Sequence, residues 1–160
     1  MTDIRWPVEH RVAGADIHAV NRAVSTASPG QVWQWIVRPD RWSEIYPNAH
    51  RVRHLAGPWP EISLGSCFSW ITLGAPVTTT VTECEPCERL AWSGTGPGAR
   101  GHHAWLLQPV AGGGCEILTE ETQRGLPVRV LRPVLRPAMQ RMHQRWVDAL
   151  AVTAPQRSPA

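Results

Sequence analysis

The chain has 160 residues, which is enough for one well-packed domain and short for two. Its formal net charge is only +3, and no recognition motif accompanies the basic residues, so we expect no nucleic-acid partner. We recognise neither a signal peptide nor an apolar run long enough to cross a bilayer, and we therefore expect a cytoplasmic protein with no membrane span.

The chain begins with residues 1–14, which show no clear period and are expected to form a loose N-terminal arm. A single domain is expected over residues 15–152. The polar, Pro-containing tail over residues 153–160 is expected to be disordered. A first strand is predicted from about Asp16 to Ser25.

Two short helices are predicted after this strand. Ser28 supplies an N-cap, Pro29 takes the first helical position and Gln31 takes the capping-box position. Pro39 ends this helix, and a second helical turn is predicted over residues 39–45.

Strands and turns alternate from there to residue 124, because Gly and Pro clusters separate short runs of strand-forming residues. The six predicted strands are Arg51 to Ala56, Ser66 to Leu73, Val77 to Glu83, Arg89 to Ser93, His102 to Gln108 and Cys115 to Gln123. Connections as short as these favour antiparallel neighbours.

The last segment changes to a helical period. Its apolar stripe is formed by Leu131, Leu135, Met142, Trp146 and Ala149, flanked by Met139 and Leu150. Pro133 and Pro137 lack a backbone donor, so the helix either starts late or is kinked there. The predicted fold class is α+β, with a curved, seven-stranded antiparallel sheet wrapped around this helix. The space between sheet and helix is a candidate ligand pocket.

The hairpin on either side of residues 110–114 gives the best indication of chemistry. Alternation places His103 and Trp105 on one face of its first strand, and Thr119 and Glu121 on one face of its second. Antiparallel pairing then puts Trp105 opposite Thr119 and His103 opposite Glu121, on the apolar face.

Two roles for the His103–Glu121 pair stay open. The carboxylate would orient the imidazole and raise its pKa, which would make His103 a catalytic acid or base near neutral pH. Alternatively, the two side chains satisfy each other's hydrogen bonds and do no chemistry.

Aromatic and methionine side chains gather on the predicted inner surface, where flat rings suit a polycyclic or polyene ligand. The expected ligand-binding residues are Tyr46, Phe68, Trp70, Trp92, Trp105, Thr119, Met139, Met142 and Trp146. Each of them could equally be ordinary core packing. Arg100 could pair with a polar end of the ligand, although a surface role fits it better.

The four cysteines are expected to be free thiols. Cys84 and Cys87 have the spacing of a redox pair or of half a zinc site, but no second pair with metal spacing follows them. His102 and His103 are adjacent in a strand and face opposite ways, so they cannot readily share an ion. We therefore expect no metal and no cofactor.

The order of elements and several short segments resemble the SRPBCC superfamily, also called START-like or helix-grip, and within it the polyketide cyclase/dehydrase and lipid-transport family. The segments that carry the resemblance are Ser28-Pro29-Gly30-Gln31-Val32-Trp33, Pro39-Asp40-Arg41-Trp42, Gly65-Ser66-Cys67-Phe68, Val81-Thr82-Glu83-Cys84-Glu85-Pro86, Arg89-Leu90-Ala91-Trp92, His103-Ala104-Trp105-Leu106-Leu107 and Thr119-Glu120-Glu121. The chain departs from the family pattern at Cys84 and Tyr46, and both residues could reshape the pocket.

The resemblance implies a deep apolar cavity, usually without a metal or redox cofactor. It leaves two functions open for a monomer or homodimer. One is a cofactor-independent enzyme that promotes cyclisation, dehydration or rearrangement of a polyketide- or terpenoid-like intermediate in natural-product biosynthesis. The other is a carrier that binds a lipid or hydrophobic metabolite without chemistry.

Overall fold

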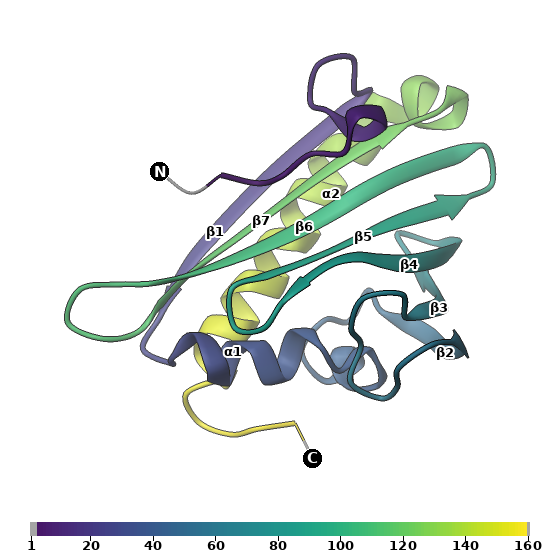
Figure 1. Cartoon of the computed structure of the whole chain (residues 1–160). Coiled ribbons are helices and arrows are strands. Elements are labelled where there is room, and N and C mark those ends of the chain that lie inside the picture. The colour runs from purple at the N-terminus through teal and green to yellow at the C-terminus, as the bar shows by residue number, and fades with distance from the viewer. Residues whose placement is uncertain (1–2, 160) are drawn as a thin grey trace.

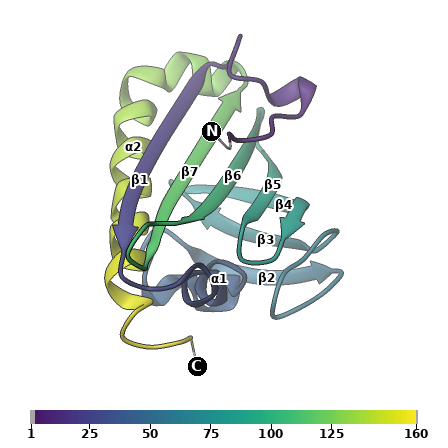
Figure 2. The ribbon, with the colours of Figure 1, turned by 60° about the vertical axis from the view of Figure 1, so that its left-hand side comes forward.

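The fold is α+β, with one antiparallel sheet curved around the C-terminal helix α2 (Figures 1 and 2). The computed structural model describes residues 3–159. The elements are η1 (Val8–His10), β1 (Ile17–Ser25), α1 (Pro29–Ile36), η2 (Pro39–Glu44), β2 (His50–Ala56), β3 (Cys67–Thr72), β4 (Ala75–Glu85), β5 (Arg89–Gly96), β6 (Ala99–Pro109), β7 (Cys115–Arg124) and α2 (Leu126–Thr153). All seven predicted strands and the predicted fold class are confirmed.

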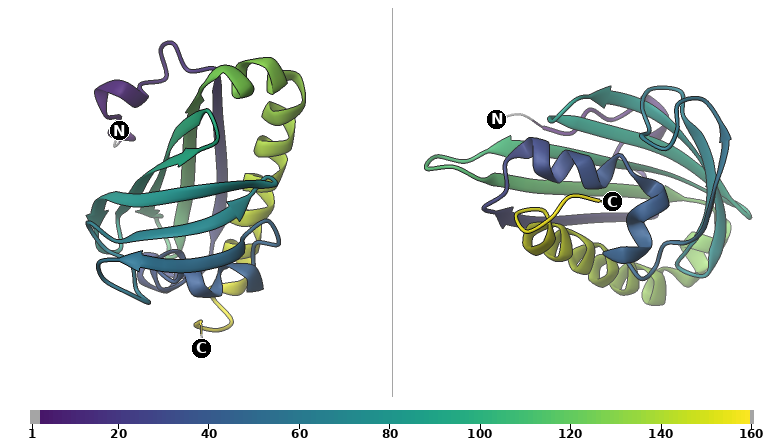
Figure 3. Two further views of the ribbon diagram at one scale, coloured as in Figure 1. Left: turned by 90° about the vertical axis from the view of Figure 1, so that its right-hand side faces the viewer. Right: turned by 90° about the horizontal axis from the view of Figure 1, so that it is seen from below.

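The strand order is β1-β7-β6-β5-β4-β3-β2, so β2 to β7 follow one another as hairpins. β1 pairs with β7 at one edge of the sheet, while α1 and η2 carry the chain to β2 at the other edge. Seen from below, α1 and η2 close one end of the space between the sheet and α2 (Figure 3).

The predicted capping box starts α1. The Ser28 hydroxyl accepts from the Gln31 backbone N–H, and the Gln31 side chain accepts from the Ser28 backbone N–H. Pro29 stands at the first turn, where its missing donor costs nothing. The second predicted helical turn is the 3₁₀ helix η2.

Helix α2 runs through both of its prolines and bends, so its first turns lie at an angle to the rest (Figure 3). Below the bend, Asn21 of β1 donates to the Gln140 carbonyl and Ser25 donates to the Ala151 carbonyl. The prediction that Leu131 belongs to the buried stripe is wrong, because the side chain lies above the bend and is 51% exposed. Below the bend the buried stripe is Met139, His143, Trp146, Val147 and Leu150, and Val128 is buried in the first turns.

The N-terminal segment was expected to be loose but packs on the outer face of the sheet. Ile4 is buried there, and the ring of Trp6 meets the ring of His102 edge to face at a centroid distance of 5.8 Å. His10 stacks on His102 at 5.3 Å. Apolar burial thus orders a segment that shows no period in the sequence.

The chain after α2 was expected to be disordered, yet its described residues reach Pro159 and pack against α1. Ala154 is buried, and the Trp35 indole N–H donates to the Arg157 carbonyl at 3.0 Å. The Arg157 guanidinium lies over the Trp35 ring, 4.8 Å from its centroid. In the described part of the chain, no helix is long and apolar enough to cross a membrane.

Candidate active site

A pocket of about 250 Å³ lies between the sheet and the first half of α2. The β3–β4 and β5–β6 turns and the first turns of α2 surround it. Its lining is Trp70, Thr72, Leu73, Gly74, Ala75, Val77, Thr79, Trp92, Gly94, Gly96, Pro97, Ala99, Arg100, Gly101, His103, Glu121, Gln123, Pro127, Val128, Leu131, Leu135 and His143. Most of this lining is apolar, as in small-molecule sites generally, although the volume is below their usual range of about 300–1,000 Å³.

Four of the residues predicted for the site line this pocket: Trp70, Trp92, His103 and Glu121. The other expected ligand-binding residues lie outside its lining. Tyr46, Phe68, Trp105, Thr119, Met139 and Trp146 are buried, and Met142 is partly buried against the core. These residues lie in the core of this structure, and their contact with a ligand stays a prediction.

Packing of tryptophan rings explains the small volume. Trp42, from η2, sits among Phe68, Trp70, Trp92 and Trp146 with ring centroids 5.0–5.6 Å apart. These rings fill the space between the sheet and α2 at the end that η2 closes. Only the opposite end, beside the bend of α2, stays open as the pocket.

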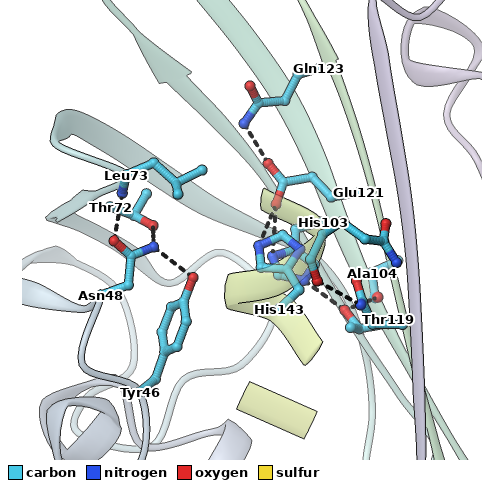
Figure 4. Close-up of polar contacts among 12 residues, drawn as sticks. Tyr46, Asn48, Thr72, Leu73, His103, Ala104, Thr119, Glu121, Gln123 and His143 are labelled. Atoms are coloured by element: carbon cyan, nitrogen blue, oxygen red, sulfur yellow. Dashed lines mark hydrogen bonds and ion pairs between the residues drawn. The ribbon is translucent and has the colours of Figure 1, made fainter. Parts of the chain in front are cut away.

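The predicted register of the β6–β7 hairpin is confirmed, with Trp105 opposite Thr119 and His103 opposite Glu121. His103 Nδ1 lies 3.3 Å from Glu121 Oε2, and both side chains face the pocket (Figure 4). His103 is 4% exposed and Glu121 13% exposed, so the pair is largely removed from water.

A third titratable side chain, His143 of α2, joins the pair. Its Nε2 is also 3.3 Å from Glu121 Oε2, and its ring stacks on His103 with centroids 4.7 Å apart. Sequence analysis missed His143. Its signal was the helical spacing of Met139, His143 and Trp146, which places the histidine on the buried stripe.

Two neighbouring polar side chains fix the orientation of the cluster. Thr119 Oγ1 donates to the Ala104 carbonyl at 3.0 Å and lies 2.6 Å from His103 Nε2. Because the hydroxyl has only one proton, it accepts from Nε2–H, which leaves the Nδ1 lone pair of neutral His103 directed toward Glu121. Gln123 donates to Glu121 Oε1 at 2.7 Å and leaves Oε2 for the two imidazoles.

Burial shifts the pKa values of Glu121 and His103 in the directions opposite to those expected for an ion pair. The pKa of Glu121 is raised from 4.5 to about 7, mainly by desolvation, against which the Gln123 hydrogen bond acts. Desolvation first, and then the nearby His143, hold the pKa of His103 well below its usual value. Desolvation lowers the pKa of His143 to about 4. The prediction that Glu121 raises the His103 pKa is therefore wrong, and Glu121 is the group that titrates near neutral pH.

The cluster also contains three potential metal ligands, since one atom from each of His103, Glu121 and His143 lies within 4.8 Å of the others. The ring geometry does not fit an ion. The two imidazole planes are stacked and tilted by only 24°, so their in-plane lone pairs do not converge on one point within bonding distance. Coordination by both rings would require one of them to rotate.

Tyr46 supports the pocket from outside. Its ring stacks on Trp146 at 4.1 Å, and its hydroxyl accepts from Asn48 Nδ2 at 2.7 Å. Asn48 also binds the Thr72 hydroxyl and the Leu73 backbone N–H, and so fastens the β3–β4 turn that borders the pocket (Figure 4). Burial raises the pKa of Tyr46 to about 12, so the phenol stays neutral.

The remaining candidates lie away from the cluster. All four cysteines are free, and burial raises the pKa of Cys84, which disfavours the reactive thiolate. Arg100 is exposed at the boundary between the pocket and a neighbouring surface cleft.

Comparison with known proteins identifies the family. The family model described as polyketide cyclase / dehydrase and lipid transport matches residues 16–154. No protein of curated function matches the chain.

Solved structures share the fold along nearly the whole chain. A hypothetical protein from Helicobacter pylori, jhp0584, is 27% identical with a TM-score of 0.88, and the match covers 96% of this chain and 97% of that one. The ZhuI aromatase/cyclase from Streptomyces sp. R1128 is 13% identical with a TM-score of 0.74, covering 88% and 94%. Norcoclaurine synthase from Thalictrum flavum is 11% identical with a TM-score of 0.67, also covering 88% and 94%. The family match and this fold together place the chain in the polyketide cyclase/dehydrase and lipid-transport family.

Proposed function

We propose that the protein binds a hydrophobic, polyketide- or terpenoid-like intermediate in its pocket and promotes cyclisation, dehydration or rearrangement by proton transfer, without a cofactor. The observation that carries this proposal is the His103–Glu121–His143 cluster, three titratable groups at the wall of an otherwise mainly apolar pocket. An apolar pocket orients the substrate and excludes water, and the cluster supplies the acid and base.

Glu121 is the proton carrier in this proposal. A group with a pKa near the working pH is populated in both protonation states, which is the condition for efficient acid–base catalysis. As a carboxylate, Glu121 removes the proton from a carbon next to a ketone, and the C–H electron pair forms the enolate. The protonated Glu121 then gives this proton to a departing hydroxyl, which leaves as water.

His103 and His143 are positioning residues for this carboxyl. Both imidazoles are neutral when the pKa values are lowered as above, so neither provides a permanent positive charge that would trap Glu121 as a carboxylate. The Nδ1 lone pair of His103 can accept a hydrogen bond from protonated Glu121 and so stabilise the acid form.

The test uses a bicyclic ketone such as 2-tetralone as a probe, in D2O, and follows replacement of its α-protons by mass spectrometry. Glu121→Gln keeps the shape of the side chain but cannot carry the proton, and we expect exchange to slow by roughly two to four orders of magnitude. The matched control is Glu120→Gln, because Glu120 is the neighbouring residue in β7 and contacts His18 instead. Equal exchange by Glu121→Gln and the wild type would reject the proposal.

The alternative function is a carrier for a lipid or hydrophobic metabolite. The apolar pocket wall favours it, because transport needs the pocket and no proton transfer. Leu135→Trp, which fills the pocket, should abolish quenching of tryptophan fluorescence by a bound ligand, whereas the exposed Val152→Trp should not. Ligand binding that depends on Leu135, together with exchange that does not depend on Glu121, would identify a carrier.

A further inference from the structure

The first turns of α2 expose an unusual amount of apolar surface. Ten large apolar side chains are exposed in the described part of the chain, and four of them fall within nine residues of this helix: Leu126 at 72%, Val130 at 66%, Leu131 at 51% and Val134 at 69%. Leu126, Val130 and Val134 recur every four residues and form a row along one side of the helix. We name Leu126, Val130, Leu131 and Val134 the α2 apolar row.

Basic residues flank this row. Arg129, Arg132 and Arg136 are exposed, and residues 126–137 contain no acidic residue. Arg129 pairs with Asp16 at 2.9 Å. Arg132 and Arg136 have no carboxylate within salt-bridge distance among residues 3–159, so their charges are available to an external anion.

The row stands at the entrance of the pocket. Leu131 belongs both to the row and to the pocket lining, and Pro127, Val128 and Leu135 line the pocket from the same turns. The bend of α2 tilts its first turns away from the lower helix, so that these turns lie at one end of the molecule (Figure 3).

We propose that the α2 apolar row docks on an anionic lipid bilayer and presents the pocket entrance to it. Apolar side chains that protrude from a helix, with arginines beside them, are typical of segments that lie in a membrane interface. The unpaired charges of Arg132 and Arg136 select anionic head groups. A hydrophobic ligand concentrates in the bilayer. Docking therefore places the pocket entrance next to the lipid in which the ligand is dissolved.

The composition of the row favours a bilayer over a protein partner. The row has only Leu and Val, and arginines flank it without any acidic residue over residues 126–137, as in helices that lie on anionic bilayers. Separate aliphatic side chains need no complementary surface in a fluid bilayer. This inference depends on the exposed face of α2 and does not rest on the proposed proton transfer.

The experiment is co-sedimentation of the full chain with vesicles of phosphatidylcholine alone or mixed with phosphatidylglycerol. We expect binding to the mixed vesicles only. Leu126→Ser/Val130→Ser/Val134→Ser should weaken it by at least about tenfold, because each exposed side chain loses its burial in the bilayer. Arg132→Glu/Arg136→Glu should weaken it more than about twentyfold, since each arginine contributes about fivefold.

Matched controls are chosen from other exposed positions. Val8→Ser/Val24→Ser/Val152→Ser changes three apolar side chains of similar exposure, and Arg51→Glu/Arg53→Glu makes the same charge change on β2. The proposal is overturned if the wild type does not bind mixed vesicles, or if the controls lose as much binding as the row variants. It is also overturned if light scattering shows a dimer that the triple Ser variant converts to monomer, because a second copy would then cover the row. Probe exchange in solution is measured separately, so failure here and failure of the proposed function are distinguishable.

Discussion

Glu121 should make folding stability fall as the pH rises, because its carboxyl is raised in pKa by burial. The folded protein binds a proton at Glu121 up to about pH 7, whereas the unfolded chain releases it near its ordinary 4.5. Above pH 4.5 the unfolded state therefore holds fewer protons at this site, and the contribution to the free energy of unfolding declines until the folded carboxyl has also ionised.

The size of this decline follows from the shift. Each pKa unit corresponds to about 1.4 kcal/mol, so the rise from 4.5 to about 7 amounts to a loss of roughly 3 kcal/mol across that interval. His143 acts in the opposite direction, because its lowered pKa makes stability rise with pH between about 4 and 6.5, and His103, whose pKa is also lowered, acts in the same direction as His143. The wild type alone would therefore show only the sum of these effects.

Comparison with Glu121→Gln isolates the carboxyl. Urea unfolding of both proteins at a series of pH values should give a free-energy difference that moves in favour of the variant by roughly 3 kcal/mol as pH rises from 4.5 to above 7. Glu120→Gln is the control for loss of a carboxylate from the same strand. A difference between wild type and Glu121→Gln that is constant with pH would refute the burial argument.

Three further changes test the supports of the site and the chain ends, each by urea unfolding. Thr119→Val leaves the Ala104 carbonyl and His103 Nε2 without their partner and should cost about 1–3 kcal/mol; no loss would mean that the hydroxyl does not hold the imidazole. Ser28→Ala removes the α1 cap and should cost about 1 kcal/mol, unlike Ser43→Ala at an exposed position of η2. Ending the chain at Thr153 should also cost about 1–3 kcal/mol, because it leaves the buried Trp35 indole without its acceptor, and unchanged stability would argue against tail docking.

The structural features that the sequence alone predicted depend on local rules. Strand alternation and a short turn fix a hairpin register, so the facing of His103 and Glu121 could be predicted before any tertiary contact was known. The capping box at Ser28 and Gln31 is equally local.

The structural features that the sequence did not predict depend on contacts between segments that are far apart in the chain. His143 contacts Glu121 only because α2 packs across the sheet next to this residue of β7. The raised pKa of Glu121 follows from how much water is excluded around the carboxyl group. The pocket volume depends on the three-dimensional packing of Trp42 with its neighbours, which periodicity cannot describe. The N-terminal arm packs on the sheet through Ile4, Trp6 and His10, a set too small to give a recognisable period.

We propose above that Glu121 transfers protons to and from a ligand in the pocket. The most direct measurement is the pH dependence of α-proton exchange of the bound ketone probe in D2O, for the wild type and Glu121→Gln. The wild-type rate should rise with pH to a plateau with an apparent pKa near 7, because the base must be ionised. This rise should be lost in Glu121→Gln. An identical profile in the two proteins would contradict the claim.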